Sequence, residues 1–357
     1  MDAEMETLKI IDISQQEQWN LTVKKFSNWD IYYLWEYAYS LFLHGDGTPK
    51  LIYFQKEQAS VCYVVMENDI AKEPFFSGYL NEGEYLDWTT PYGYGGPLVE
   101  GQLWDSFASQ LIEELTRYAA DNHIVTQFLR FHPLLGNQKN FEDVMDVVYL
   151  KKTIYMDTSD EDTIFLNMTS KNRNMVRKAI KNDIKIVTDH GERLKEFQRV
   201  YEATMERHQA ESYYYFEESY YQFLMTHMKK NTVFFYAEFQ GQVVSASIFF
   251  YNDRYMHYHL SGTLPQHRNL AAANLLLDEA AKWAAGRGIK CLHLGGGVAN
   301  EDSLYAFKKQ FNRNGELDFC IGRSIFMPDA YQQLVALRRD NDKTFDDQRP
   351  FLIKYRG

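Results

Sequence analysis

The chain has few cysteines, and their arrangement suggests neither a disulfide framework nor a metal site. The three are Cys62, Cys291 and Cys320, widely spaced, with no two forming a CxxC pair. An odd number at such spacing argues against a stapled secreted fold and against a zinc cluster. It is typical of buried, inert thiols in a reducing compartment. We therefore expect a cytoplasmic protein with no metal ligands.

Long apolar runs and excess positive charge are also missing. No stretch approaches the ~20 apolar residues of a membrane-spanning helix. The acidic start MDAEMETLKI lacks the apolar core of a signal peptide. Acidic residues number 49 against 38 basic ones, a formal net charge of -11. Because phosphate contacts need a basic surface, such a chain is not a general nucleic-acid binder, and any nucleic-acid site must be a local basic patch.

Familiar catalytic signatures are absent from the sequence as well. It contains no GxSxG elbow, HExxH, P-loop or EF-hand. The triple glycine Gly295-Gly296-Gly297 is not a GxGxxG fingerprint, because Ala299 and Asn300 occupy the later positions. The neighbouring Glu301-Asp302 would repel a pyrophosphate. The sequence therefore predicts neither a dinucleotide-binding fold nor a serine or cysteine nucleophile.

What the chain does contain is one order of elements repeated twice within 357 residues, a length that fits two domains. The first half predicts a hairpin, a glycine-rich loop, a helix and a strand, at 50–66, 91–97, 103–122 and 124–131. The second predicts a hairpin, a strand, a helix and a strand, at 232–252, 254–262, 270–288 and 289–294. Between them, 161–228 is expected to be helical.

This order of hairpin, strand, loop, helix and strand is the core order of the acetyltransferase (GNAT) fold. We predict an α/β protein with mixed sheets and two tandem GNAT-like units. Residues 1–150 with 324–357 are expected to form the first unit, and 151–323 the second, which would carry the acyl-transfer site.

The loop before the second-half helix resembles the donor-binding loop of GNAT enzymes, Q/R-x-x-G-x-G/A. Residues 268–273, RNLAAA, keep the arginine (Arg268) and the final small residue, but Ala271 replaces the central glycine. In that fold, backbone amides at a helix N-terminus bind the donor's pyrophosphate. The alternative is an ordinary loop with a solvated arginine.

A short helix is predicted over 302–311, capped by Asp302 or Ser303. At 100° per residue, Leu304, Phe307 and Phe311 share one face, and Lys308 lies beside Leu304, whereas Lys309 points away. A lysine on an apolar stripe either extends past it to solvent or is directed at an anionic or reacting group.

The segment 170–185 predicts a second helix with segregated charge, for which Ser170 can act as the cap. One arc holds Met175, Val176, Ala179 and Ile180, and the other holds Lys171, Arg173, Arg177, Lys178 and Lys181. A one-sided basic helix in an acidic protein is a candidate phosphate-binding surface. The alternative is a solvated helix face.

A third segment, 201–216, places Arg207 and His208 just before the aromatic cluster Tyr213–Phe216. An arginine in such surroundings suits bidentate recognition of a phosphate or carboxylate. We take Arg207 and Tyr215 as candidate substrate-binding residues. A lone histidine there is more often structural than catalytic.

Several of these segments, in order, resemble the FemAB-like group of the GNAT superfamily. They are PYGYGGP (91–97), FLRFHP (128–133), KNRNMVRKA (171–179), YEATMERHQAESYYYF (201–216), HLSGT (259–263), HLGGG (293–297) and SLYAFKKQF (303–311). The resemblance implies bacterial enzymes with a substrate cleft between two GNAT-like domains, the C-terminal segment completing the first. Characterised members move an amino acid from aminoacyl-tRNA onto a peptidoglycan-precursor amine.

The resemblance also assigns roles to particular residues. It places the lysine that assists acyl transfer at Lys308, beside Phe307, and a phosphate-contacting arginine at Arg207. Tyr92 and Tyr94 of the glycine-rich loop, with Arg268, Arg173 and Arg177, are further candidates for substrate binding. The long coiled-coil arm of some members has no counterpart in 161–228.

We therefore expect an acyltransferase of the cell envelope. It would use acyl-CoA or aminoacyl-tRNA as co-substrate, hold no tightly bound cofactor, and act on an amine or hydroxyl of a small, phosphate-bearing acceptor or sugar nucleotide. Two alternatives stay open: an acetyl-CoA-dependent N-acetyltransferase acting on a small amine or sugar, and a non-catalytic double-GNAT module that only binds ligands.

Overall fold

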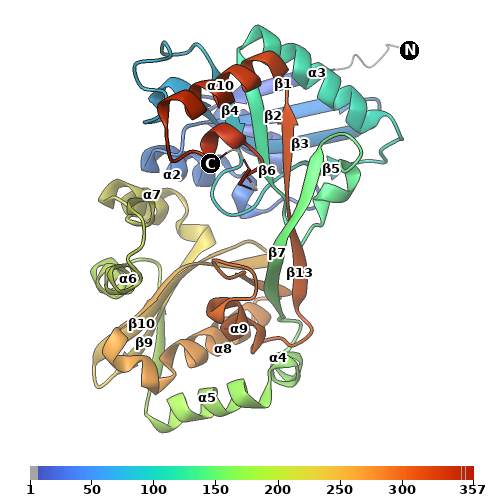
Figure 1. Ribbon diagram of the computed structural model, residues 1–357. Coiled ribbons are helices and arrows are strands. Elements are labelled where there is room, and N and C mark those ends of the chain that lie inside the picture. Colours follow the sequence, from blue (N-terminus) through green and yellow to red (C-terminus); the bar gives the residue numbers. More distant parts are fainter. Residues whose placement is uncertain (1–6, 347, 350) are drawn as a thin grey trace. The chain divides into compact units, whose positions relative to one another are not determined.

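The computed structural model describes residues 7–346, 348–349 and 351–357 (Figure 1). The chain forms two compact units, Met1–Leu150 with Phe319–Gly357, and Lys151–Asp318. Each unit is a mixed sheet covered by helices, and the points at which the chain passes between the units lie within strands β7 (Asp146–Asp157) and β13 (Glu316–Ile325). Among the described residues, no helix combines the length and apolar character needed to cross a membrane.

The sheet of the first unit runs in the order β1-β2-β3-β4-β6-β13, and the short β5 pairs with β3. Its only parallel neighbours among the described residues are β4 and β6. The bounds are β1 Thr7–Asp12, β2 Thr48–Lys56, β3 Ala59–Asp69, β4 Leu86–Thr89, β5 Leu98–Glu100 and β6 Ile124–Arg130. The helices are α1 Gln16–Val23, α2 Trp35–His44, α3 Phe107–Asp121 and α10 Pro328–Asn341.

The sheet of the second unit runs β8-β9-β10-β11-β12-β7, and only β11 and β12 are parallel in the part that the structure describes. The strands are β8 Lys185–Asp189, β9 Thr232–Phe239, β10 Gln242–Tyr251, β11 Tyr255–Thr263 and β12 Cys291–Gly295. The helices are α4 Glu161–Asn167, α5 Ser170–Lys181, α6 Leu194–His208, α7 Glu218–His227, α8 Ala272–Ala285 and α9 Ser303–Lys309.

The two units repeat one topology, which confirms the predicted tandem fold. Each sheet has three antiparallel pairings, then one parallel pairing, then a final antiparallel strand. The parallel pair is joined by a crossover containing one long helix, α3 in the first unit and α8 in the second. A parallel pairing requires such a crossover, because a tight turn can only reverse the chain.

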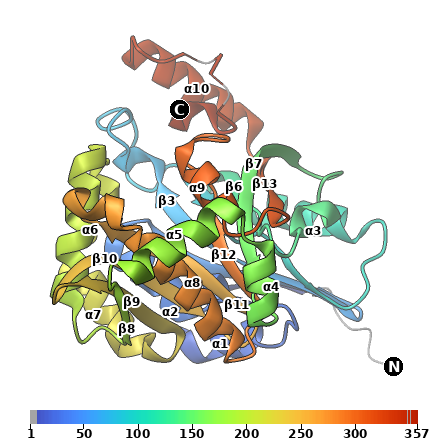
Figure 2. The ribbon, with the colours of Figure 1, turned by 90° about the horizontal axis from the view of Figure 1, so that it is seen from below.

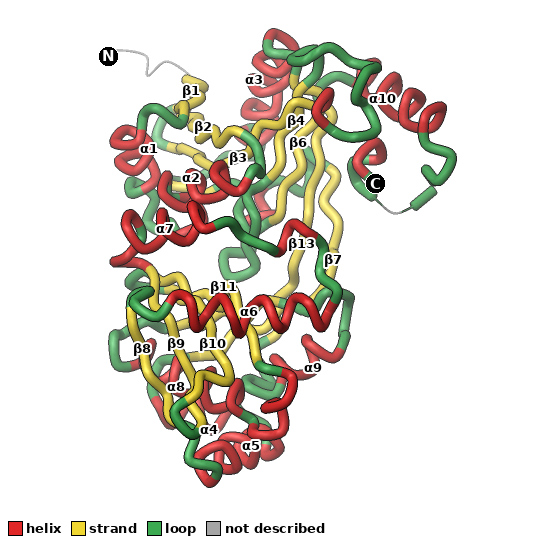
Figure 3. Tube along the Cα trace, turned by 90° about the vertical axis from the view of Figure 1, so that its left-hand side faces the viewer, coloured by secondary structure: helices red, strands yellow, loops and turns green. Residues whose placement is uncertain are grey.

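Helices cover both faces of the second sheet, and strand alternation decides which residues each helix meets. On β9, the Phe235 ring packs against Trp283 of α8, with centroids 6.0 Å apart. The neighbouring Phe234 points the other way and packs against Phe197 of α6, with centroids 5.7 Å apart. Helix α5 packs on α8 (Figure 2), and α6 covers the opposite face of the sheet (Figure 3).

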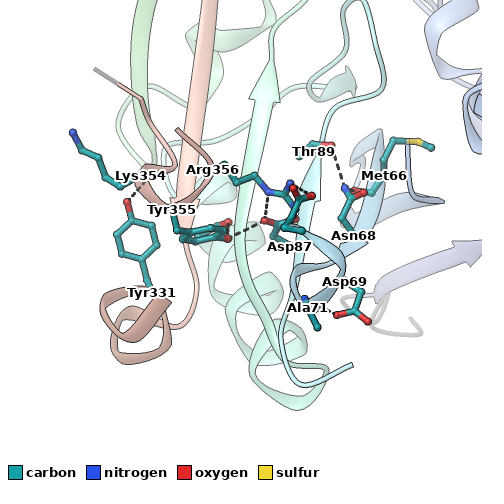
Figure 4. A network of polar contacts seen from close by, with 12 residues as sticks. Met66, Asn68, Asp69, Ala71, Asp87, Thr89, Tyr331, Lys354, Tyr355 and Arg356 are labelled. Carbon is teal, nitrogen blue, oxygen red and sulfur yellow. Dashed lines mark hydrogen bonds and ion pairs between the residues drawn. The ribbon is translucent and has the colours of Figure 1, made fainter. Parts of the chain in front are cut away.

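The last turn of the chain, Lys354–Arg356, packs on the first unit through a buried polar network (Figure 4). The Arg356 guanidinium contacts both carboxylate oxygens of Asp87, at 2.6 and 2.8 Å. The Tyr355 hydroxyl donates to the same carboxylate at 2.9 Å. Asp87 is only 1% exposed, and its charge is therefore compensated by partners from the C-terminal segment.

The structure corrects several local predictions. Residues 185–189, expected within a helical region, form the edge strand β8. Helix α5 is capped by the Thr169 side chain, which accepts from the Asn172 amide, and Ser170 is its first residue. Ile180, predicted on the apolar arc of α5, is 58% exposed, and Leu304 of α9 is 39% exposed.

Candidate active site

The second sheet opens where its parallel pair of strands separates. Strands β11 and β12 are paired only from Tyr255–Cys291 to His257–His293. Beyond that point β11 continues to Thr263, and β12 ends at Gly295. The backbone of β11 after His257 thus has no partner in β12, and the loop after Gly295 leads directly into α9.

Asp302 organises that loop and starts the helix. Its carboxylate accepts hydrogen bonds from the amides of Val298 and Ala299, at 2.7 and 3.1 Å, and from the Tyr305 amide at 2.8 Å. The last contact is an N-cap, which satisfies an amide that the first helical turn leaves without a partner. The same carboxylate therefore fixes the loop backbone and the direction of α9.

Lys308 projects from the inner side of α9 and is 7% exposed. Its Nζ donates to the Gly296 carbonyl oxygen at 2.7 Å and lies 5.8 Å from the centre of the Tyr258 ring. A second amine, that of Lys151 on β7, donates to the carbonyl oxygens of Gly297 and Val298, at 2.6 and 3.1 Å. The loop that follows β12 thus presents the carbonyl groups of residues 296–298 to two lysines.

Burial and the nearby charge of Lys151 lower the pKa of Lys308 to about 7, and Asp302 opposes the shift. Removing an ammonium from water disfavours its charged form, and a like charge adds to that effect. At neutral pH the amine therefore populates both protonation states, which suits a group that accepts a proton and returns it.

The other residues of α9 are placed differently. Lys309 forms an ion pair with Glu316, and hydrogen bonding to that carboxylate raises the pKa of Lys309. Phe307 is half-buried and packs edge-on against Phe311, with ring centroids 5.3 Å apart. Phe307 thus supports the helix from the core side.

Tyr258 lies on the part of β11 where the strands separate. Its hydroxyl interacts with the hydroxyls of Ser247 and Ser261, which face each other across β10 and β11. Burial raises the pKa of Tyr258, and the two serines oppose the rise. The phenol therefore stays protonated at neutral pH, and the centre of its ring lies 5.8 Å from the Lys308 amine.

A separate basic cluster lies at the N-terminal end of α8. Arg207 and His208, from the end of α6, contact each other, and Arg268 lies close enough to depress both pKa values. For each group burial is the largest cause of that lowering. Ala271 immediately precedes α8 in the left-handed conformation, with φ 58°. Adjacent cations beside a helix N-terminus favour an anion.

The basic helix α5 does not contribute to that cluster. It packs on α8, on the sheet face opposite α6. The Arg173 guanidinium donates to the carbonyl oxygens of Phe165 and Met168, at 3.2 and 2.6 Å, whereas Arg177 is exposed and contacts Asn174. Arg207 and the α5 arginines are therefore not brought together on one face of the unit.

The three candidate tyrosines occupy different surroundings. Tyr215 lies between α6 and α7 and is 38% exposed. Tyr92 and Tyr94 belong to the first unit, where Asn137 donates to the carbonyl oxygens of Gly95 and Pro97 and holds their loop. The Tyr94 ring packs edge-on against Phe319. This loop is shaped by contacts within its own unit.

Sequence reasoning did not find Tyr258, Ser261 or Lys151. The segment around Tyr258, RYMHYHLSG, reads simply as a strand, and its special position depends on where β11 and β12 separate. Lys151 is distant in sequence from the glycines that it contacts. The triple glycine was the available signal, because a Cβ at Gly296 would lie 2.8 Å from the Lys152 carbonyl oxygen, so the close approach of the two backbones requires glycine.

Comparisons with known proteins agree with this arrangement. The acetyltransferase (GNAT) domain family matches residues 170–309. The fold resembles FemX with a TM-score of 0.66 and 13% identity, over 91% of this chain and 99% of that one. L-PGS from Bacillus licheniformis gives 0.53 and 13%, over 86% and 90%. A tandem GNAT protein from the clavulanic acid biosynthesis pathway gives 0.51 and 8%, over 90% and 99%. No curated protein matches the chain.

The repeated topology and the separated parallel strands define a tandem GNAT protein, and the matched family makes it an acyltransferase. The second unit contains the stretch that matches the acetyltransferase (GNAT) domain family, and the chain shares its fold with FemX.

Proposed function

We propose that the second unit transfers an acyl or aminoacyl group from an activated ester or thioester to an amine or hydroxyl of a cell-envelope precursor or sugar nucleotide. The observation that carries the proposal is the buried Lys308, held beside separated strands with a pKa of about 7. Lysine side chains are rarely buried without a partner of opposite charge, and this one faces a carbonyl group.

The reaction needs alignment and proton transfer rather than a protein nucleophile. The acceptor amine attacks the donor's carbonyl carbon and forms a C–N bond. Collapse of the tetrahedral intermediate breaks the C–O or C–S bond to the leaving group. Neutral Lys308 takes the proton released by the attacking amine and returns it to the departing oxygen or sulfur. The Tyr258 hydroxyl stabilises the developing oxyanion.

The donor's phosphates are assigned to the cluster of Arg207, His208 and Arg268. Arg207 and Arg268 are neighbouring cations in a chain of net charge -11, and they favour a phosphate-bearing ligand. The lowered pKa of His208 leaves its ring neutral at pH 7, where it can act as a hydrogen-bonding group. We favour aminoacyl-tRNA or another donor that is not CoA, because Ala271 replaces the glycine of the CoA-binding loop. For the acceptor, we propose a small, phosphate-bearing molecule.

Acetyl-CoA is the second candidate donor, and one observation favours it. Ala271 keeps the left-handed backbone, φ 58°, at the position where the CoA-binding motif has glycine. The turn into α8 is therefore retained, and the first amides of α8, which have no acceptor within the helix, are available to bind a phosphate.

Turnover assays with aminoacyl-tRNA and with acetyl-CoA, each with UDP-muramyl peptides and amino sugars as acceptors, test the proposal. Lys308→Ala should lower turnover by about 10²-fold or more, on the scale of losing one group that stabilises the transition state. In the wild type, kcat/KM should rise with pH, with a midpoint at about 7.

Lys309→Ala is the matched control, because it removes the neighbouring lysine of the same helix. The Lys309 amine forms an ion pair with Glu316 instead of facing the loop after β12. It should keep most of the turnover and the same pH midpoint. Near-normal turnover of Lys308→Ala, or an unchanged pH profile in that variant, contradicts the role of Lys308.

A further inference from the structure

Helix α5 and the end of α4 carry a basic and apolar surface that the acyl-transfer site does not use. The 12 residues of α5, SKNRNMVRKAIK, include five basic side chains and no acidic one. Three exposed apolar residues flank that charge: Phe165 and Leu166 of α4, and Ile180 of α5, at 49%, 61% and 58% exposure. We call these eight residues the α4–α5 patch.

Contacts within the unit hold the apolar and basic parts of the patch together. The Arg173 guanidinium lies over the Phe165 ring, 5.0 Å from its centre, while donating to carbonyl groups at the end of α4. Exposed Arg313, outside the patch, donates to the Leu166 carbonyl oxygen at 3.0 Å and adds another cation beside it. The corner between α4 and α5 is therefore fixed, with aromatic and aliphatic groups among guanidinium groups.

The buried side of α5 excludes one use of this helix. Val176 and Ala179 are buried in the core with α8, so α5 cannot insert into an apolar phase as an amphipathic helix would. Its solvent-facing side carries the charge, including Arg177, Lys178 and Lys181. Contact through this side would be electrostatic, with Phe165, Leu166 and Ile180 as shallow anchors.

We propose that the α4–α5 patch docks the second unit on an anionic lipid bilayer. Basic side chains near a bilayer are attracted by its negative surface potential, and neighbouring Phe and Leu side chains favour the interfacial region. A nucleic acid would also be attracted by the basic side chains, but its binding would not require the exposed apolar side chains of Leu166 and Ile180 beside them. The combination fits a lipid surface better.

Acidic groups near the patch define the orientation. Glu161 and Asp162 lie at the start of α4, about one helical turn before Phe165. Asp183 follows the end of α5 and lies 3.9 Å from Lys185. These carboxylates are repelled by an anionic surface, so the end of α4 and the middle of α5 face the bilayer.

Vesicle co-sedimentation tests the proposal with the full chain. Binding is expected to vesicles of phosphatidylcholine mixed with phosphatidylglycerol, to weaken as salt is added, and to be absent with phosphatidylcholine alone. Arg177→Gln with Lys181→Gln should lower the partition coefficient by about fivefold for each cation removed. Phe165→Ser with Leu166→Ser should lower it at unchanged net charge.

Matched controls separate the patch from general charge and apolar exposure. Lys229→Gln with Lys230→Gln removes the same charge from exposed residues after α7, and Leu21→Ser removes an exposed leucine from the first unit. Both should bind mixed vesicles like the wild type. Melting temperatures verify that each variant folds. If Phe165→Ser with Leu166→Ser is unstable, Arg177→Gln with Lys181→Gln still tests the proposal, because both of its side chains are exposed.

The proposal is overturned if the wild type does not bind mixed vesicles, or if neither patch variant reduces that binding. It is also overturned if deacylated tRNA binds through Arg177 and Lys181 in preference to the vesicles. Turnover with water-soluble donor and acceptor should be unchanged in the patch variants, so a failure of docking is distinguishable from a failure of the acyl-transfer proposal.

Discussion

The amine of Lys308 lies 2.7 Å from the carbonyl oxygen of Gly296. The Lys308 side chain is only 7% exposed. This contact keeps a titratable amine inside the second unit without a carboxylate as its hydrogen-bond partner. Burial therefore makes the charged form costly, and the folded state favours the neutral amine more than the unfolded chain does.

A pH dependence of stability follows from that difference. The folded pKa of Lys308 is about 7, against an ordinary value of 10.5. Between these values the unfolded chain binds more protons, so this lysine makes the free energy of unfolding rise with pH, by up to about 1.4 kcal/mol per unit. Lys308→Met should lack this rise. Urea unfolding of both proteins across the window measures it, and parallel curves would contradict the burial of a neutral amine.

The contact between α6 and the loop before α8 gives a second prediction. Arg207→Ala and Arg268→Ala should each raise the KM for a phosphate-bearing donor by about tenfold or more, because each removes a charge-assisted hydrogen bond. The kcat should change less. Arg268→Ala should also raise the pKa of His208, which the arginine lowers, and an NMR titration measures that shift directly.

Arg287→Ala is the control for this pair, since it removes an exposed arginine of the same unit that lies over the Trp283 ring. It should leave both the KM and the pKa of His208 unchanged. If Arg287→Ala raises the KM as much as Arg207→Ala does, general charge explains the effect and the cluster has no special role.

The repeated fold was predictable because its main elements carry strong local patterns. Helix α3 buries Leu111, Leu115 and Ala119 at helical spacing, and its counterpart α8 has the same kind of pattern. The hairpins at 50–66 and 232–252 alternate apolar runs with a polar turn. Strand β8 was missed because its residues KIVTD lie at a sheet edge, where partial exposure removes the alternation.

The candidate site was only partly predictable. The position of Lys308 on an apolar face of α9 was predictable, since a short capped helix has a known periodicity. Its partner Tyr258 depends on where β11 leaves β12, and Lys151 depends on the pairing of β7. Likewise, Arg207 and Arg268 meet because α6 packs against the loop before α8. Such long-range relations have no local sequence signal.

Gly297 gives a third prediction, which concerns the loop that Asp302 holds. A Cβ at Gly297 would lie 2.0 Å from a carboxylate oxygen of Asp302. Gly297→Ala should therefore displace the N-cap of α9, lower the stability by about 1 kcal/mol and reduce turnover by misplacing Lys308. Gly286→Ala is the control, because Gly286 has φ -62° and its nearest atom would lie at 3.5 Å.

The Gly286 control should be neutral or stabilising by about 0.4–1 kcal/mol, since alanine restricts the unfolded chain without strain in the folded one. Thermal unfolding and turnover of the two variants make the comparison. Equal behaviour of Gly297→Ala and Gly286→Ala would mean that the loop can adjust and that Asp302 does not determine the position of Lys308.

The last prediction concerns Arg356 and Asp87 in the first unit (Figure 4). Arg356→Met removes the guanidinium from a carboxylate that is 1% exposed, and the Tyr355 hydroxyl, which donates to it at 2.9 Å, carries no compensating charge. An uncompensated buried charge costs about 3–5 kcal/mol, so the variant should unfold at a much lower urea concentration. Adding Asp87→Leu removes that charge, and the double variant should recover much of the loss. If the double variant is less stable than Arg356→Met alone, the cost arises from lost packing of the C-terminal turn rather than from the unpaired carboxylate.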